Sequence, residues 1–252
     1  MKKFLPLTLL VFGVVVMLGA YFLVIKGKKV EETPVDENKV LLDVPLEKRP
    51  IVSLTPTSDG HYLNMKIEKI FIDNASSLDY ELIYKLASGI SQGVPGTVDI
   101  KGKKEFEAEV LLGSESSGKF RYDEGVNEGT LTLRFRDDKG KLMTKFTTEF
   151  SLSSNKDNFS TPNGEFSITL NKVPKKEYFV LMETWGIPDY TPTTISKGPY
   201  GLFSSTDTKQ LLGRVSMGES KVFMHITGPR WEEFEDVSTL NSDTGIFYGS
   251  SE

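Results

Sequence analysis

Apolar and polar residues alternate with a period of two along most of the chain after residue 50. In residues 62–72, for example, Leu63, Met65 and Ile67 fall on one face and mostly polar residues fall on the other. This period is typical of strands that bury one face, whereas a helix would give a period of 3.6. Turn residues interrupt the alternation at short intervals. The pattern therefore predicts an all-β protein.

A first block of short strands is predicted between residues 51 and 153. Its strands cover residues 62–72, 79–86, 105–112, 119–122, 130–136 and 141–152. The last two flank the sequence Asp137-Asp138-Lys139-Gly140, which is typical of a turn, so they form the clearest hairpin in the chain. Strands of this length and spacing are typical of an immunoglobulin-like or fibronectin-like β-sandwich.

The polar segment 153–163 predicts a domain boundary, and a second β domain is expected over residues 163–252. Its strands are predicted at residues 165–170, 178–184, 198–203, 211–217, 221–227 and 245–248. The mostly apolar segment 178–184 indicates a central strand, because such a strand is buried on both faces. Residues 234–240 are interpreted as an edge strand.

The N-terminal segment has a different pattern, because residues 4–25 are 22 consecutive residues without a charge. At about 1.5 Å per residue, a helix of this length spans a hydrocarbon layer of ~30 Å. A cleavable signal peptide is the alternative, but its apolar part is usually ~7–15 residues long and ends at a small-x-small site. Here Leu18 stands two positions before Ala20. We therefore expect residues 1–29 to be an uncleaved transmembrane anchor with basic flanks.

Residues 30–50, rich in Lys, Glu and Pro, are predicted to be a stalk. The positive-inside rule does not decide the orientation, because the basic flanks of the anchor are nearly balanced. A short N-terminal tail before one apolar helix resembles a signal anchor, so we expect the body to lie outside the cytoplasm. Residues 30–252 carry 25 basic and 35 acidic side chains, a formal charge of −10. This charge repels phosphate backbones, so no nucleic-acid partner is expected.

Residue types that carry chemistry are sparse. The chain has no cysteine, and its two histidines, His61 and His225, are far apart in sequence. The serine-nucleophile motif G-x-S-x-G and the phosphate-binding glycine motifs are absent. Two distant histidines supply too few ligands for zinc. We therefore expect no catalytic residue, no metal site and no cofactor, and we predict that the protein is not an enzyme.

Four aromatic residues flank Pro- and Gly-rich turns: Trp185, Tyr190, Tyr200 and Trp231. Aromatic side chains on loops stack on sugar rings or form protein interfaces, which makes these four the candidate ligand or interface residues. The alternative is that they close the open end of the core.

The C-terminal block resembles a known family. The segments YFVLMETWG, GPYGLF, LLGRVSM and KVFMHIT, followed by residues 234–240 and DTGI, are similar to the extracytoplasmic β domain of anti-sigma-K-type membrane regulators. Those regulators carry a sigma-binding domain before the transmembrane helix, whereas three residues precede Phe4 here. The resemblance therefore implies a shared β module, not sigma-factor inhibition, and no functional residue carries over.

These features together predict two consecutive β-sandwich-like domains behind one transmembrane helix. The expected function is that of a single-pass, extracytoplasmic, non-enzymatic module that binds an envelope or surface protein or forms part of the cell envelope. A carbohydrate-binding surface module that uses the loop aromatics is the alternative.

Overall fold

The computed structural model describes residues 41–206, 211–226, 230–234, 238–240 and 245–251. The described residues after Val40 form one compact unit. Within this part the chain is built from strands and one short 3-10 helix, η3 (Leu46–Lys48), so the all-β prediction is confirmed. The predicted transmembrane segment, residues 4–25, lies outside the described residues.

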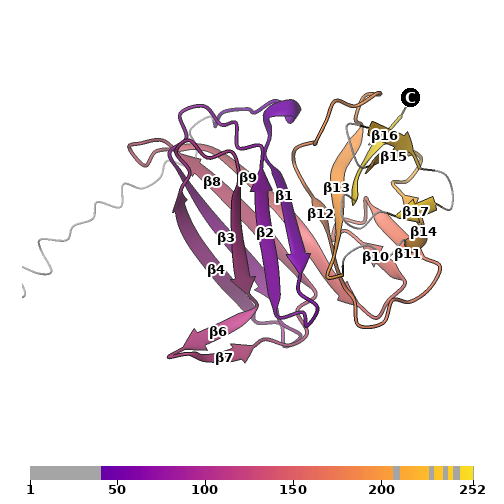
Figure 1. Ribbon diagram of the computed structural model, residues 1–252, viewed down its shortest axis with the longest axis horizontal. Helices are drawn as coiled ribbons and strands as arrows, with labels where there is room; N and C mark the ends of the chain where they lie inside the picture. Colours follow the sequence, from indigo (N-terminus) through magenta and orange to yellow (C-terminus); the bar gives the residue numbers. More distant parts are fainter. Residues whose placement is uncertain (1–40, 207–210, 227–229, 235–237, 241–244, 252) are drawn as a thin grey trace, which may run out of the picture. The chain divides into compact units, whose positions relative to one another are not determined.

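The strands form four sheets (Figure 1). The largest contains nine described strands in the order β16 (Arg230–Glu233), β15 (Lys221–Ile226), β18 (Gly245–Ser250), β13 (Lys197–Ser204), β12 (Tyr178–Glu183), β9 (Leu142–Ser154), β8 (Glu128–Arg136), β3 (Ser77–Lys85) and β4 (Ser91–Asp99). A three-stranded sheet has the order β1 (Ile51–Pro56), β2 (Tyr62–Glu68) and β5 (Phe106–Leu111). A four-stranded sheet has the order β10 (Asn158–Ser160), β11 (Ser167–Leu170), β14 (Leu211–Ser216) and β17 (Ser238–Leu240). The two-stranded sheet is the hairpin of β6 (Gly113–Ser116) and β7 (Lys119–Tyr122).

Strand β12 takes part in two hydrophobic cores. It pairs with β9 on one side and with β13 on the other, which confirms the central strand predicted from its apolar sequence. Val180 and Met182 point into one core, whereas Phe179 and Leu181 point into the other. Because successive side chains of a strand point to opposite faces, the two cores lie on opposite faces of the nine-stranded sheet.

The first core lies between the three-stranded sheet and the part of the large sheet that contains β3, β8 and β9. Leu63, Met65 and Ile67 are buried in it, as their alternation predicts. The second core lies between the four-stranded sheet and strands β12, β13, β18 and β15 of the large sheet. We call residues 51–154 the first half of the body and residues 155–251 the second half. The nine-stranded sheet runs through both halves.

The β8–β9 hairpin is confirmed. Its strands pair in register from Glu128 opposite Ser151 to Arg136 opposite Leu142, with one irregularity. Asp137 closes the turn, because its carboxylate oxygen Oδ1 accepts the backbone N–H groups of Lys139 and Lys141, each at 2.9 Å. The turn interpretation of this acidic residue therefore holds.

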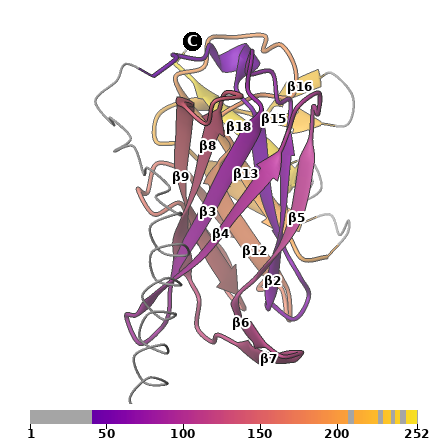
Figure 2. The same cartoon turned by 90° about the vertical axis from the view of Figure 1, so that its left-hand side faces the viewer.

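The strands give the body two distinct ends, which Figure 2 shows at top and bottom. At the upper end the chain joins the body, where the Leu42 N–H donates to the Met143 carbonyl at 3.0 Å, close to the β8–β9 turn. At the lower end lie the β1–β2 turn, the β6–β7 hairpin, the β9–β10 turn and the β11–β12 loop (Figures 1 and 2).

Candidate functional site

Two of the four predicted aromatics are buried in the cores. Trp185 follows β12, is 4% exposed, and donates its Nε1–H to the Thr147 carbonyl at 3.2 Å. Its ring packs against Phe146 with a centroid distance of 5.4 Å. Tyr200, in β13, is also 4% exposed and donates its hydroxyl to Glu165 Oε2 at 2.8 Å. These placements favour the packing alternative for both residues.

The other two predicted aromatics are more accessible than these. Trp231, on strand β16, is half-buried and meets His225 and Tyr248 edge to face at 5.0 and 4.8 Å. Its Nε1 is buried without a hydrogen-bond partner within the described residues. His225 Nε2 lies 2.8 Å from Asp189 Oδ2, so this histidine is paired.

Tyr190 is 90% exposed, next to Asp189 in the loop between β12 and β13. It borders an open cavity of about 400 Å³ lined by Leu46 and Glu47 of η3, by Ile187 and by residues 190–195. The structure therefore does not bring the four aromatics onto one accessible surface. Only Tyr190 presents most of its side chain to solvent.

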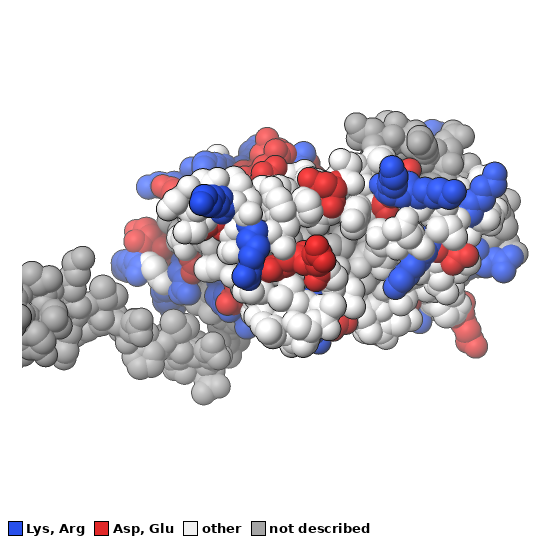
Figure 3. Space-filling model, turned by 90° about the horizontal axis from the view of Figure 1, so that it is seen from below, with Lys and Arg blue, Asp and Glu red and all other residues white. Residues whose placement is uncertain are grey.

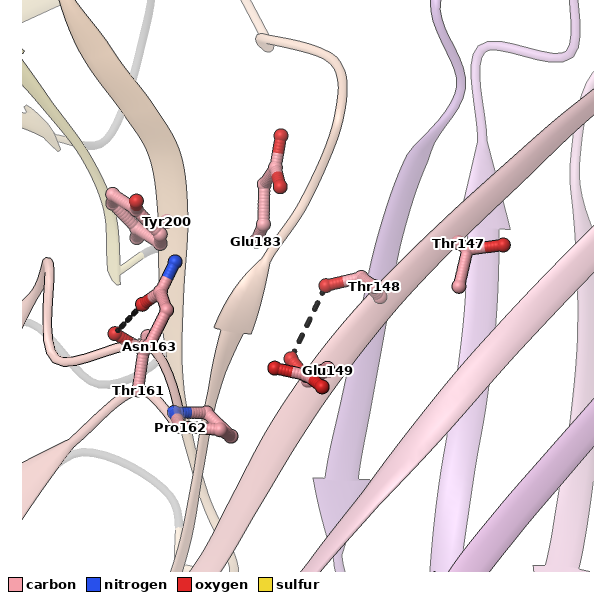
Figure 4. Close-up of a pocket in the computed structure, with 8 residues that line it drawn as sticks. All are labelled: Thr147, Thr148, Glu149, Thr161, Pro162, Asn163, Glu183 and Tyr200. Atoms are coloured by element: carbon pink, nitrogen blue, oxygen red, sulfur yellow. Dashed lines mark hydrogen bonds between the residues drawn. The ribbon is translucent and has the colours of Figure 1, made fainter.

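A polar cavity that the sequence did not predict lies where the two halves meet (Figure 4). It has a volume of about 180 Å³. Its lining residues are Thr147, Thr148, Glu149, Thr161, Pro162, Asn163, Glu183 and Tyr200. Figure 4 shows the β9 residues on one side, Asn163 and Tyr200 on the other, and Glu183 between them.

Three of the polar residues around this cavity, Thr161, Asn163 and Tyr200, form hydrogen bonds within or to the β10–β11 turn. The Thr161 hydroxyl donates to Asn163 Oδ1 at 2.7 Å and accepts the Phe166 N–H at 3.2 Å. The hydroxyl of Tyr200 donates to Glu165, and burial together with this bond raises its pKa. This hydroxyl is therefore fixed as a neutral donor. The turn depends on these bonds for its shape.

Glu183 is an ionisable residue of the cavity whose carboxylate is not hydrogen-bonded to the β10–β11 turn. Burial raises its pKa, and the negative charge of Glu165 adds to this effect, while the positive charge of Arg49 opposes it. Within the described residues, the carboxylates of Glu183 and Glu149 accept no hydrogen bond from another side chain. The cavity can therefore hold a proton or a small polar group. No group of three or more metal-ligating side chains is found among the described residues.

A second feature is a set of four aromatic rings at the lower end, which we call the aromatic cluster: His61, Tyr62, Phe120 and Tyr122. The His61 ring stacks on Tyr122 with centroids 3.9 Å apart and an angle of 4°. Phe120 and Tyr122 are two positions apart on β7 and are parallel within 10°, with centroids 6.3 Å apart. They are 50% and 38% exposed. The hairpin therefore presents large apolar rings to solvent.

Hydrogen bonds hold the aromatic cluster in place. A hydrogen bond to Tyr122 raises the pKa of Tyr62 to about 12, with smaller contributions from lost solvation and nearby negative charges. In the β1–β2 turn, Asp59 Oδ1 accepts the Thr57 hydroxyl at 2.5 Å and the His61 N–H at 3.0 Å. These two bonds lower the pKa of Asp59. The turn that carries His61 is thus ordered by a charged carboxylate.

Four exposed lysines occupy two neighbouring loops at the lower end of the second half: Lys156, Lys172, Lys175 and Lys176. We call them the lysine cluster. The two loops are held together by the Lys176 N–H, which donates to Asn155 Oδ1 at 3.4 Å. Seen from below, basic side chains are spread over this half of the body (Figure 3). Three of its members, Lys172, Lys175 and Lys176, lie within five residues of the sequence, and folding adds Lys156 from the second loop.

Comparisons with protein-family models, with curated proteins and with solved structures give no match for this chain. Among the described residues, no helix has the length and apolar character needed to span a bilayer.

Proposed function

We propose that the protein is a single-pass membrane protein whose β-rich body acts outside the cytoplasm as a non-enzymatic binding module of the cell envelope. In this proposal residues 4–25 are the membrane anchor, and the body consists of two β-sandwich-like parts. The resemblance of the C-terminal block to the extracytoplasmic β domain of anti-sigma-K-type regulators is consistent with such a body.

The observation that carries the proposal is the position of the accessible side chains relative to the point where the N-terminal segment joins. That segment joins the body at the upper end, where Leu42 is hydrogen-bonded to Met143 and to the Thr144 hydroxyl. The aromatic cluster and the lysine cluster lie at the lower end. Both clusters therefore lie at the end of the body opposite to Leu42, one of the first residues that the structure describes. We call the lower end with both clusters the distal surface.

Protease treatment of intact cells tests the location of the body. We expect the body to be digested in intact cells, while a cytoplasmic marker protein remains whole until the cells are lysed. A body that resists digestion in intact cells and is cleaved only after lysis would contradict the proposal.

The anchor is tested by Val15→Arg, which places a charge in the middle of the apolar segment. Such a charge costs about 2.5–3.5 kcal/mol in membrane insertion. We expect a measurable shift of the protein from the membrane fraction to the soluble fraction. Val15→Leu is the matched control and is expected to leave the protein in the membrane.

Carbohydrate binding through the loop aromatics remains the alternative function. It has one supporting observation: Tyr190 is almost fully exposed beside a cavity of about 400 Å³. This alternative predicts that Tyr190→Ala abolishes retention on a polysaccharide column and leaves the melting temperature unchanged.

A further inference from the structure

We propose that the distal surface binds an anionic polysaccharide, with sugar rings on the aromatic cluster and acidic groups on the lysine cluster. This inference rests on the proposed function, because it names the ligand of the same binding module. It uses different residues from the loop aromatics that the sequence suggested.

The aromatic cluster has the chemistry for sugar rings. Phe120 and Tyr122 project from the same face of β7, since side chains two apart on a strand point the same way. Their rings are parallel and partly exposed, and His61 supports Tyr122 by stacking against it at 3.9 Å. Aromatic rings that are already ordered lose little conformational entropy when a ligand covers them. The hydroxyls of Tyr62 and Tyr122 bond to each other and together keep one donor and free acceptor lone pairs for sugar hydroxyls.

The lysine cluster supplies the charge that selects an anionic ligand. Its four ammonium groups stand out in a body whose residues 30–252 carry a formal charge of −10. The acidic residues nearest in sequence are Asp157, which is exposed, and Glu177, which is buried. None of the four lysines forms a side-chain ion pair with another described residue. A local excess of positive charge attracts anionic groups, and this attraction weakens as salt is added.

The turn that carries His61 contacts the strand that follows the lysine-bearing β11–β12 loop. Gly60 precedes His61 and lies against the ring of Tyr178, so close that a Cβ on Gly60 would be 2.5 Å from it. Tyr178 in turn follows the β11–β12 loop two residues after Lys176. A polymer that stacks on the hairpin can therefore reach the lysines without leaving the surface. A single sugar would meet only one of the clusters, which is why we infer a polymer.

Binding is measured with the full-length protein in detergent micelles, using polygalacturonate as the anionic polysaccharide. Three further polymers separate the contributions: neutral dextran, polyglutamate and single-stranded oligo(dT). We expect retention on polygalacturonate that falls with added salt, and weaker binding to the other three. Equal binding to polyglutamate or oligo(dT) would show that charge alone is recognised, and equal binding to dextran would show that the lysines are irrelevant. Either result, or no binding to polygalacturonate, overturns the proposal.

Two double variants test the two clusters separately. We expect Lys172→Ala/Lys175→Ala and Phe120→Ala/Tyr122→Ala each to weaken polygalacturonate binding about tenfold at low salt. The two lysines are exposed, so the melting temperature of the lysine variant is expected to stay within about 2 °C of the parent. The aromatic variant also removes the stacking of Tyr122 on His61, so its melting temperature is measured first and its binding is compared at a temperature at which it remains folded. The lysine variant is also expected to flatten the salt dependence, which a purely structural change would not do.

The chain offers a matched control for each variant at the opposite end. Lys101→Ala/Lys103→Ala makes the same charge change on the exposed β4–β5 loop, and Phe71→Ala removes an exposed aromatic ring. Neither is expected to alter binding. Loss of binding in these controls and not in the distal variants would overturn the distal site. Because purified protein is used, this result is independent of the protease experiment that tests the location of the body.

Discussion

The two halves of the body bury their cores on opposite faces of one sheet. In the first half, the three-stranded sheet covers one face, and the other face of β3, β8 and β9 carries charged and polar residues such as Glu81 and Arg134, which pair at 3.0 Å. In the second half, the four-stranded sheet covers that second face. Strand β12 lies between the three-stranded sheet on one face and the four-stranded sheet on the other, so it is buried on both faces. This comparison explains why most strands alternate in sequence while β12 is continuously apolar.

The largest expected effect comes from removing one large side chain from each core. Phe150 belongs to the first core and Phe166 to the second, and both are fully buried. Each change to alanine is expected to lower the free energy of unfolding by about 3–5 kcal/mol. Because β12 joins the two cores, we expect each variant to lower the midpoint of one shared unfolding transition, measured by calorimetry. Two separate transitions, of which each variant shifts only one, would show that the halves unfold independently.

Trp185 and Tyr190 compare a core aromatic with a surface aromatic in the same loop. Trp185→Ala is expected to lower the free energy of unfolding by about 3 kcal/mol, because a large buried ring and its hydrogen bond to the Thr147 carbonyl are lost. Tyr190→Ala is expected to change stability by less than about 0.5 kcal/mol. Chemical denaturation measures both. Trp185 would be a ligand residue, and not part of the first core, if its alanine variant kept full stability.

A smaller effect is expected at the contact between the lower ends of the halves. Gly60 has a φ of +73° and packs on Tyr178, so Gly60→Ala introduces both backbone strain and a steric conflict. We expect the free energy of unfolding to fall by about 1–2 kcal/mol. Gly89→Ala is the matched control, because Gly89 has a φ of +82° with no atom within 4 Å of the added Cβ. Equal losses in the two variants would mean that the Tyr178 contact contributes nothing.

Much of the fold could be predicted from the sequence, because period-two alternation marks strands that bury one face. The β8–β9 hairpin and the central β12 were predicted correctly. Strand β4 was missed, since Gly93, Pro95 and Gly96 interrupt its pattern. It lies at the edge of the sheet, where a proline is tolerated.

The joining of both halves by one sheet was also not visible in the sequence. Strand pairing between distant segments, such as β9 with β12, is set by tertiary contacts that leave no local signal. The same reason applies to the candidate site. The aromatic cluster combines the β1–β2 turn with the β6–β7 hairpin, and the lysine cluster combines two loops. The exposed Phe120 and Tyr122 alternate as core residues would, so their position on a projecting hairpin could not be read from the pattern.

The smallest effect is expected at the cavity between the halves, where Glu183 ends the doubly buried strand. Its pKa is raised, so the folded protein holds the proton more tightly than the unfolded chain. Below the ordinary glutamate pKa of 4.5 both states are protonated and the burial of this side chain carries no charge penalty. As the pH rises through the raised pKa, the charge appears in the partly buried site and stability is lost. Glu183→Gln is therefore expected to raise the melting temperature by about 2 °C at neutral pH and to have no effect in acid. Glu149→Gln, on the exposed side of the same cavity, is the control and is expected to change less. A Glu183→Gln variant that is less stable than the parent at neutral pH would instead show that the attraction to Arg49 outweighs the cost of burial.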